Sequence, residues 1–294
     1  MSELLQYVFI GLGNGAVYAM VGLGLVVIYR STGLLNFAQG ELAMFATFGV
    51  WTLHEAGLPI WLALLGGMAI GFAIGAIVHQ VVVRPVGDPH QKPLAVVIVT
   101  IGLFLGFNAL AQLIWGTNEK EFATLFGNSE VDVLGTLVDW QKLGALGILA
   151  AEALVFWVIF QKTKVGLGMR AVASNPESSA LVGIPVTRIL MIGWGLAVSV
   201  GAVAGAVWAP TPGLSSNLMQ LPLIYGFAAI TLGGFDSFVG AVVGGLFVGV
   251  LTDVVPRYVD AFEKMTLAPA FLVILVVLLV RPQGIFGRKV VSRV

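Results

Sequence analysis

Apolar residues occupy most of the chain in long stretches that polar loops separate. Stretches long enough to cross a bilayer lie at 7–29, 34–53, 58–83, 94–115, 143–161, 189–209, 221–235, 238–255 and 267–280. A crossing needs about 20 helical residues, because each residue rises ~1.5 Å. The stretches at 221–235 and 238–255 form either two crossings or a re-entrant pair. The pattern predicts an all-α polytopic membrane protein with about nine transmembrane or re-entrant helices, within a range of roughly 8–10.

The composition excludes a soluble fold of this size. Hydrophobic residues make up 58% of the 294 residues and charged residues only 10%, whereas a soluble domain carries about a quarter charged residues. Residues 1–294 are therefore expected to form a single transmembrane domain whose surface contacts the lipid bilayer. The net charge is zero, so no bulk attraction to nucleic acid is expected.

Glycine is abundant, at 38 residues, and many glycines recur four positions apart. These sets are Gly11/Gly15, Gly67/Gly71/Gly75, Gly102/Gly106, Gly201/Gly205, Gly240/Gly244 and Gly245/Gly249. This spacing puts small residues on one helix face and lets neighbouring backbones approach closely. The glycines therefore predict helix packing and need no functional explanation.

Basic residues are divided unevenly between the loops. Nine crossings place the termini on opposite sides, and 11 basic residues then face 4 across the membrane. The larger group is Arg30, Arg84, Lys92, Lys162, Lys164, Arg170, Arg188, Arg281, Arg288, Lys289 and Arg293, and the smaller is Lys120, Lys142, Arg257 and Lys264. Because basic loops favour the cytoplasm, we expect the N-terminus outside and the C-terminus in the cytoplasm. Loop 116–142 is then outside and loop 162–188 inside.

The sequence lacks the motifs of nucleotide hydrolysis and of metal catalysis. No Gly-Lys dipeptide occurs, so the chain has no P-loop. There is no Cys, and His54, His79 and His90 do not have the paired spacing of metal ligands. We expect the chain to be no enzyme and to bind no cofactor or metal itself.

A polar segment interrupts the second apolar stretch. Arg30–Gly33 breaks an apolar helix, and Asn36, Gln39 and Glu41 follow at membrane depth. Polar groups persist there when they pair inside a bundle or line a wet cavity, so helix–helix hydrogen bonding and a broken helix along a substrate path both remain open. On one continuous helix, Asn36 and Gln39 would share a face, which we assign to the path. Glu41 points elsewhere and should accept hydrogen bonds from a neighbouring helix or from the break.

The inside loop 162–188 contains the signals of a short helix. Asn175 can cap its start, Pro176 suits the first turn, Glu177 suits the positive end of the helix, and Gly183 can end it. These residues predict a helix over 176–182 at the cytoplasmic face. It could fit a groove of a soluble partner, or the segment could be a plain loop.

Seven short segments in a characteristic order extend along the whole chain. They are Gly15–Ala19, Ile28–Tyr29 through Asn36–Glu41, Arg84–Pro85, Thr100–Leu103, Met169–Glu177, Leu232–Phe235 and Arg281–Gly284. By their order and spacing, the sequence resembles the membrane-spanning permease subunit of bacterial ABC importers for branched-chain amino acids, of the first-permease type. Gln39 departs from the resemblance, because His is expected there in many relatives.

The resemblance implies a type II-like ABC importer permease bundle in the bacterial inner membrane. A second homologous permease would complete the pore, two cytoplasmic ATP-binding subunits would dock on loop 162–188 and use ATP, and an extracytoplasmic substrate-binding protein would deliver the substrate. The residues implied for ATPase coupling are Arg170, Ala171, Asn175, Pro176, Glu177 and Gly183. Those implied for the substrate path or its support are Tyr18, Asn36, Gln39, Glu41, Thr100, Gly233 and Gly234.

Three other functions fit parts of the sequence. The same architecture carries urea or short amides in related families. An ion-coupled secondary transporter would need carboxylates within the membrane, for which Glu41, Glu152 and Asp253 are the candidates. A purely structural subunit would tolerate apolar replacement of the polar residues at 36–41.

Overall fold

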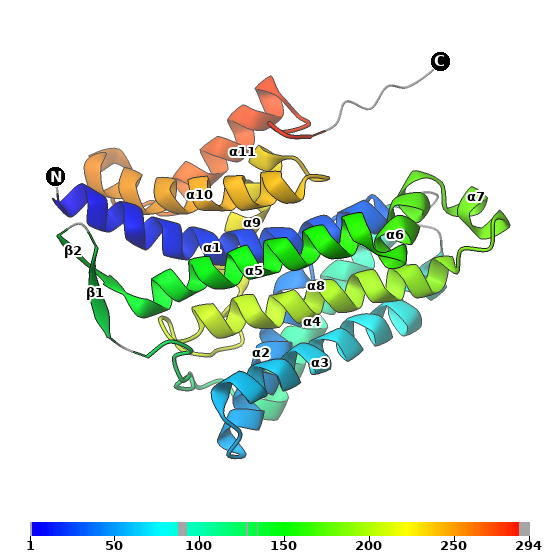
Figure 1. The fold of residues 1–294 in the computed structure, drawn as a ribbon, viewed down its shortest axis with the longest axis horizontal. Coiled ribbons are helices and arrows are strands. Elements are labelled where there is room, and N and C mark those ends of the chain that lie inside the picture. Colours follow the sequence, from blue (N-terminus) through cyan, green and yellow to red (C-terminus); the bar gives the residue numbers. More distant parts are fainter. Residues whose placement is uncertain (1, 88–92, 128, 134, 288–294) are drawn as a thin grey trace.

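The structure is a computed structural model, and it describes residues 2–87, 93–127, 129–133 and 135–287. Figure 1 shows long helices lying side by side, with their ends gathered at two faces of the molecule. The apolar helices are α1 (Ser2–Thr32), α2 (Gln39–Glu55), α3 (Ile60–Val78), α4 (Pro93–Trp115), α5 (Trp140–Lys162), α8 (Val186–Trp208), α9 (Gln220–Gly233), α10 (Phe238–Tyr258) and α11 (Ala268–Val280). A helix therefore forms in each of the nine predicted apolar stretches.

Helix length separates these nine into two groups. Six helices in the described part of the chain are long and apolar enough to cross a membrane, namely α1, α3, α4, α5, α8 and α10. The other three, α2, α9 and α11, have 17, 14 and 13 residues. At ~1.5 Å per residue they are shorter than a ~30 Å hydrocarbon core. The described chain thus shows six candidate crossings, and a count of about nine stays a prediction.

Short elements connect the helices. The segment after α3 continues as a π-helix, η1 (His79–Val83), and a 3-10 turn, η2 (Arg84–Val86). Loop 162–188 contains two helices, α6 (Lys164–Ser174) and α7 (Pro176–Leu181), and η3 (Asp260–Phe262) follows α10. The strands β1 (Glu130–Val133) and β2 (Thr136–Asp139) pair antiparallel, with Glu130 opposite Asp139. The all-α prediction is therefore wrong for loop 116–142, where the alternating residues Glu-Val-Asp-Val form a hairpin strand.

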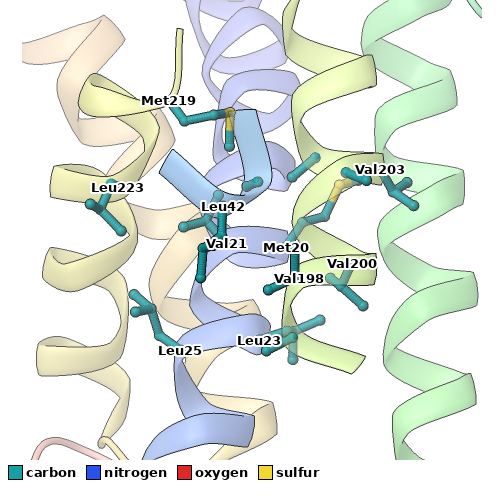
Figure 2. Close-up of a cluster of buried hydrophobic side chains, with 14 of the residues drawn as sticks. Met20, Val21, Leu23, Leu25, Leu42, Val198, Val200, Val203, Met219 and Leu223 are labelled. Carbon is teal, nitrogen blue, oxygen red and sulfur yellow. The ribbon is translucent and has the colours of Figure 1, made fainter. Parts of the chain in front are cut away.

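The core forms around α1, whose central part is almost entirely buried. Figure 2 shows Met20, Val21, Leu23 and Leu25 of α1 among side chains of α2, α8 and α9. On another side, α1 packs on α10 at glycines: a side chain at Gly15 would collide with the backbone of Gly245 and Leu246. The predicted role of these spaced glycines in close packing is confirmed here. Close packing does not explain Gly102 and Gly106, because a Cβ atom at either position would meet no atom within 4 Å.

The two ends of the bundle carry opposite charge. One end gathers α6, α7, the end of α1 and the turn before α10, and the other gathers the N-terminus and the β-hairpin (Figure 1). The basic residues near the first end are Arg30, Arg84, Lys162, Lys164, Arg170, Arg188 and Arg281. The carboxylates near the second are Glu3, Glu55, Glu119, Glu121, Glu130, Asp132, Asp139, Asp260 and Glu263. The first end also holds Glu177 and Asp236, and the second also holds Lys120, Lys142, Arg257 and Lys264, so the ends differ in net charge. Lys92, Arg288, Lys289 and Arg293 lie outside the described residues.

Candidate functional site

The polar segment after α1 is a turn followed by a new helix. Gly33 has a φ of 72° and ends α1, and its N–H donates to Tyr29 O at 2.7 Å. The Asn36 side-chain oxygen then accepts from Ala38 N at 3.0 Å. Because α2 starts only at Gln39, Asn36 precedes the helix. The expectation that Asn36 and Gln39 share one helical face is therefore wrong.

Gln39 lies between α1 and α8 and is fully buried. Its side-chain nitrogen donates to Ala197 O at 2.8 Å. The same nitrogen lies 2.8 Å from the Cβ position at Gly24, so α1 has room for the amide only because residue 24 is glycine. Gln39 Oε1 and Asn36 Nδ2 are buried and have no hydrogen-bond partner within the described chain. Such groups are costly unless something satisfies them.

Glu41 belongs to a hydrogen-bonded polar network. Its carboxylate is buried and accepts from Asn108 Nδ2 of α4 at 3.3 Å. Asn108 Nδ2 also donates to Ser216 O at 3.0 Å, and Gln112 Nε2 donates to Asn108 Oδ1 at 2.6 Å. The expected hydrogen bond from a neighbouring helix to Glu41 is confirmed. Asn108 and Gln112 were missed, although their spacing of four on an apolar helix was a readable signal.

Tyr18 and Thr100 are buried in separate surroundings. The Tyr18 ring lies 4.6 Å from that of Tyr225 and 6.2 Å from that of Trp208, as centroid distances. Thr100 is buried, and its hydroxyl donates to Val97 O within its own helix at 2.8 Å. Their assignment to the substrate path or its support stays a prediction.

Gly233 and Gly234 lie at the α6–α7 end of the bundle. A Cβ at Gly233 would come within 2.0 Å of Gly240 O, and Gly234 has a φ of 107°. The segment after α11 pairs with this turn, because Phe286 N donates to Gly233 O at 3.0 Å. The two glycines thus allow the chain to reverse between α9 and α10 while the C-terminal segment covers it.

A second polar cluster joins three helices near the hairpin end. Asn14 of α1 donates through Nδ2 to Asp253 Oδ2 of α10 at 2.9 Å, and its Oδ1 accepts from Lys142 Nζ of α5. Asp253 was recognised only as a possible coupling carboxylate. Its partners come from helices far apart in sequence, so no local pattern marks them. No set of three His, Cys, Asp or Glu residues in the described chain could hold a metal ion.

The loop at the basic end contains the helix that the sequence predicts. Asn175 Oδ1 accepts from Ser178 N at 2.8 Å and caps α7, and Pro176 is its first residue. Gly183 follows with a φ of 84°, and its N–H donates to Ala180 O at 3.0 Å. The prediction of a helix over 176–182 is confirmed to within one residue.

This helix presents an apolar tip to its surroundings. Leu181 is 89% exposed and Val182 is 77% exposed. Arg170 and Glu177 are also exposed, and Arg170 Nη1 donates to Gln161 Oε1 at 3.3 Å. Leu181 and Val182 thus form an exposed aliphatic end of α7, close in sequence to the exposed Glu177.

Comparison with known proteins covers nearly the whole chain. Residues 7–280 match the model of a family described as branched-chain amino acid transport system / permease component. The chain belongs to this permease family. The permease is 28% identical to the high-affinity branched-chain amino acid transport system permease protein LivH of Salmonella typhimurium, over 99% of this chain and 97% of that protein.

A second relative agrees with this membership. BraD of Pseudomonas aeruginosa, also a high-affinity branched-chain amino acid transport system permease protein, is 26% identical over 99% of the permease and 98% of its own length. Among solved structures, PsaBC from Streptococcus pneumoniae in complex with Fab matches 93% of the permease and 91% of that chain, with 15% identity and a TM-score of 0.48. The family match and the two named relatives, together with the apolar helices, make the chain a transmembrane ABC transport permease.

Proposed function

We propose that this permease forms half of the translocation pore of an ABC importer for branched-chain or other hydrophobic amino acids in the bacterial inner membrane. A second homologous permease completes the pore. Two ATP-binding subunits dock at residues 162–188, and an extracytoplasmic binding protein delivers substrate. The observation that carries the proposal is α7, a capped helix with an exposed apolar tip, in a chain of this family.

The charge division of the bundle supports an orientation. Basic loops favour the cytoplasm, so we place the α6–α7 end inside and the hairpin end outside. The N-terminus is then outside and the C-terminus inside. Closure of the ATPases would move α6 and α7 and shift the pore from inward- to outward-facing, as a population shift between two states.

The polar segment around Gln39 supports a position for the path. Gln39 Oε1 and Asn36 Nδ2 have no hydrogen-bond partner among the described residues, and both lie where α1 gives way to α2. We assign them to the path and Glu41 to its support. Urea or short amides remain the alternative substrates, and they would need more hydrogen bonds from the path than an aliphatic side chain does.

Paired single-cysteine variants test the docking surface and the orientation together. The chain has no Cys, and Leu181 and Leu137 are both exposed leucines at opposite ends of the bundle. We expect Leu181→Cys to cross-link to an ATP-binding subunit and to escape an impermeant thiol reagent in spheroplasts. Leu137→Cys should be labelled and should not cross-link. Labelling of residue 181 with protection of residue 137 would reverse the orientation and overturn the docking site.

A further inference from the structure

Two neighbouring cavities lie beside the end of α1, at the end of the bundle that also holds α6 and α7 (Figure 1). One has a volume of about 440 Å³ and lies between α5 and α10, and the other, of about 340 Å³, lies between the end of α1 and α6. They share three lining residues, Arg30, Phe160 and Asp236. Together they form one groove, the Arg30 groove, which extends from the side of the bundle to its basic end.

The part of the Arg30 groove between α5 and α10 has a mostly apolar wall that reaches the outer surface. Trp157 of α5 is 52% exposed, and Val239 and Val243 of α10 are 63% and 46% exposed. Lys162 Nζ lies 5.6 Å from the centroid of the Trp157 ring, and a Trp beside a Lys at the end of a membrane helix is typical of the membrane–water interface. This part therefore lies at the depth where acyl chains meet their headgroups.

The part of the groove between α1 and α6 is polar and mainly basic. The guanidinium carbon of Arg30 lies 4.9 Å from the centroid of the Phe238 ring and 5.6 Å from that of Phe160, at the junction of the two cavities. A guanidinium has five N–H donors and can serve several acceptors. Arg170 of α6 adds a second cation, and Asp236 is the only carboxylate among the described residues that line either cavity. Two cations and one carboxylate give this wall a net positive charge.

We propose that the Arg30 groove binds an anionic phospholipid. The phosphate would pair with Arg30 and Arg170, and an acyl chain would lie along Trp157 and Val243, where burial of apolar surface is favourable. Basic pockets between membrane helices suit anionic headgroups, and a headgroup hydroxyl, as in phosphatidylglycerol, can donate a hydrogen bond to Asp236. A free phosphate would use only the polar part of the groove, and a neutral hydrocarbon only the apolar part. The inference does not depend on the proposed transport function.

Photo-cross-linking of the permease, purified with its accompanying subunits and reconstituted in phosphatidylcholine nanodiscs, tests the site. The probe is phosphatidylglycerol with a diazirine in one acyl chain, and peptide mapping locates its attachment. We expect attachment within residues 153–161 of α5 and 238–247 of α10. Unlabelled phosphatidylglycerol should compete at a mole fraction at least about fivefold lower than phosphatidylethanolamine, because one basic residue near the headgroups contributes about fivefold in affinity for an anionic lipid.

Matched variants separate this groove from a general attraction to the basic end. Arg170→Gln removes a cation from the wall, whereas Lys164→Gln removes an exposed cation of the same helix that lines neither cavity. We expect the preference for phosphatidylglycerol to fall about fivefold in Arg170→Gln and to be unchanged in Lys164→Gln. Ala153→Phe, which fills the apolar part and keeps every charge, should reduce attachment of the probe to α5 and α10.

Four results would overturn the proposal. Equal losses of preference in Arg170→Gln and Lys164→Gln would show only a general attraction, and attachment outside α5 and α10 would place the lipid elsewhere. Displacement of the probe by soluble glycerol 3-phosphate would indicate a site for free phosphate. Competition by phosphatidylethanolamine equal to that by phosphatidylglycerol would show that the groove does not select an anionic headgroup.

Discussion

Glu41 and Glu152 are both single carboxyl groups within apolar helices, yet their surroundings differ. Glu41 of α2 accepts a hydrogen bond from Asn108, which also bonds to Ser216 O. The carboxyl oxygens of Glu152 in α5 are buried and have no hydrogen-bond partner among the residues that the structure describes. A buried carboxyl with partners can hold helices together, whereas one without partners adds cost and is retained for another reason. The first therefore links α2 to α4, whereas the second makes no such link within the described chain.

Replacement of Asn108 should have the largest effect on assembly and stability. It removes the hydrogen bond to Glu41 and leaves that carboxyl, like the carboxyl of Glu152, without a partner among the described residues. Asn108→Leu leaves the buried Glu41 carboxyl without the hydrogen bond from Asn108, and a buried acceptor left unsatisfied costs about 1–3 kcal/mol. We expect a marked fall in assembled permease and in its thermal unfolding temperature in mild detergent. The control is Asn108→Leu/Glu41→Leu, in which the orphaned carboxylate is removed and stability should largely return. A double variant as unstable as Asn108→Leu would show that Glu41 is not the group left unpaired.

Gln39 should give an intermediate effect on assembly, because only one end of its amide is bonded. Gln39→Leu removes the hydrogen bond to Ala197 O, and a hydrogen bond between membrane helices contributes on average ~0.6 kcal/mol. We expect assembly close to that of the parent but an altered rate of substrate uptake in whole cells. Glu41→Gln, which keeps an acceptor for Asn108, serves as the matched control and should transport normally. Normal uptake by Gln39→Leu would remove this residue from the path.

Glu152 should give the smallest effect on assembly. No described residue bonds to its carboxyl, so Glu152→Leu breaks nothing and removes a buried polar group, a change that is often neutral or stabilising. We expect a thermal unfolding temperature equal to or above that of the parent. A clear fall in the unfolding temperature would indicate that Glu152 has a partner, such as a group on a second subunit. Glu152 and Glu41 would then both be carboxyl groups that stabilise the assembly, which contradicts the account.

Much of the bundle could be predicted from the sequence because the bilayer imposes a simple constraint. Long apolar stretches mark helices wherever backbone groups must bond internally, and a helix formed in each of the nine stretches. Helix α7 was also predictable, since Asn175, Pro176 and Gly183 act through local geometry. Crossing number was harder to predict, because α2, α9 and α11 are short helices.

Features that depend on distant contacts could not be predicted. Helix α6 was not predicted; within it, a Cβ at Gly166 would collide with the backbone of Ile159 and Phe160, and one at Gly168 would collide with the side chain of Ile189. These glycines therefore serve close packing. The partner of Glu41 lies 67 positions away in sequence, and the lack of a partner for Glu152 among the described residues depends on how separate helices pack around it. Only tertiary structure distinguishes these two carboxyl groups.

Uptake into proteoliposomes tests the central claim most directly, that this chain is an ABC importer permease driven by separate ATPases. Vesicles should contain either the chain alone or the chain with the subunits that copurify in mild detergent, with the substrate-binding protein and radiolabelled leucine added. We expect uptake only in the complex and only with ATP and the binding protein. Uptake by the chain alone, driven by a proton or sodium gradient without ATP, would contradict the account and identify an ion-coupled transporter.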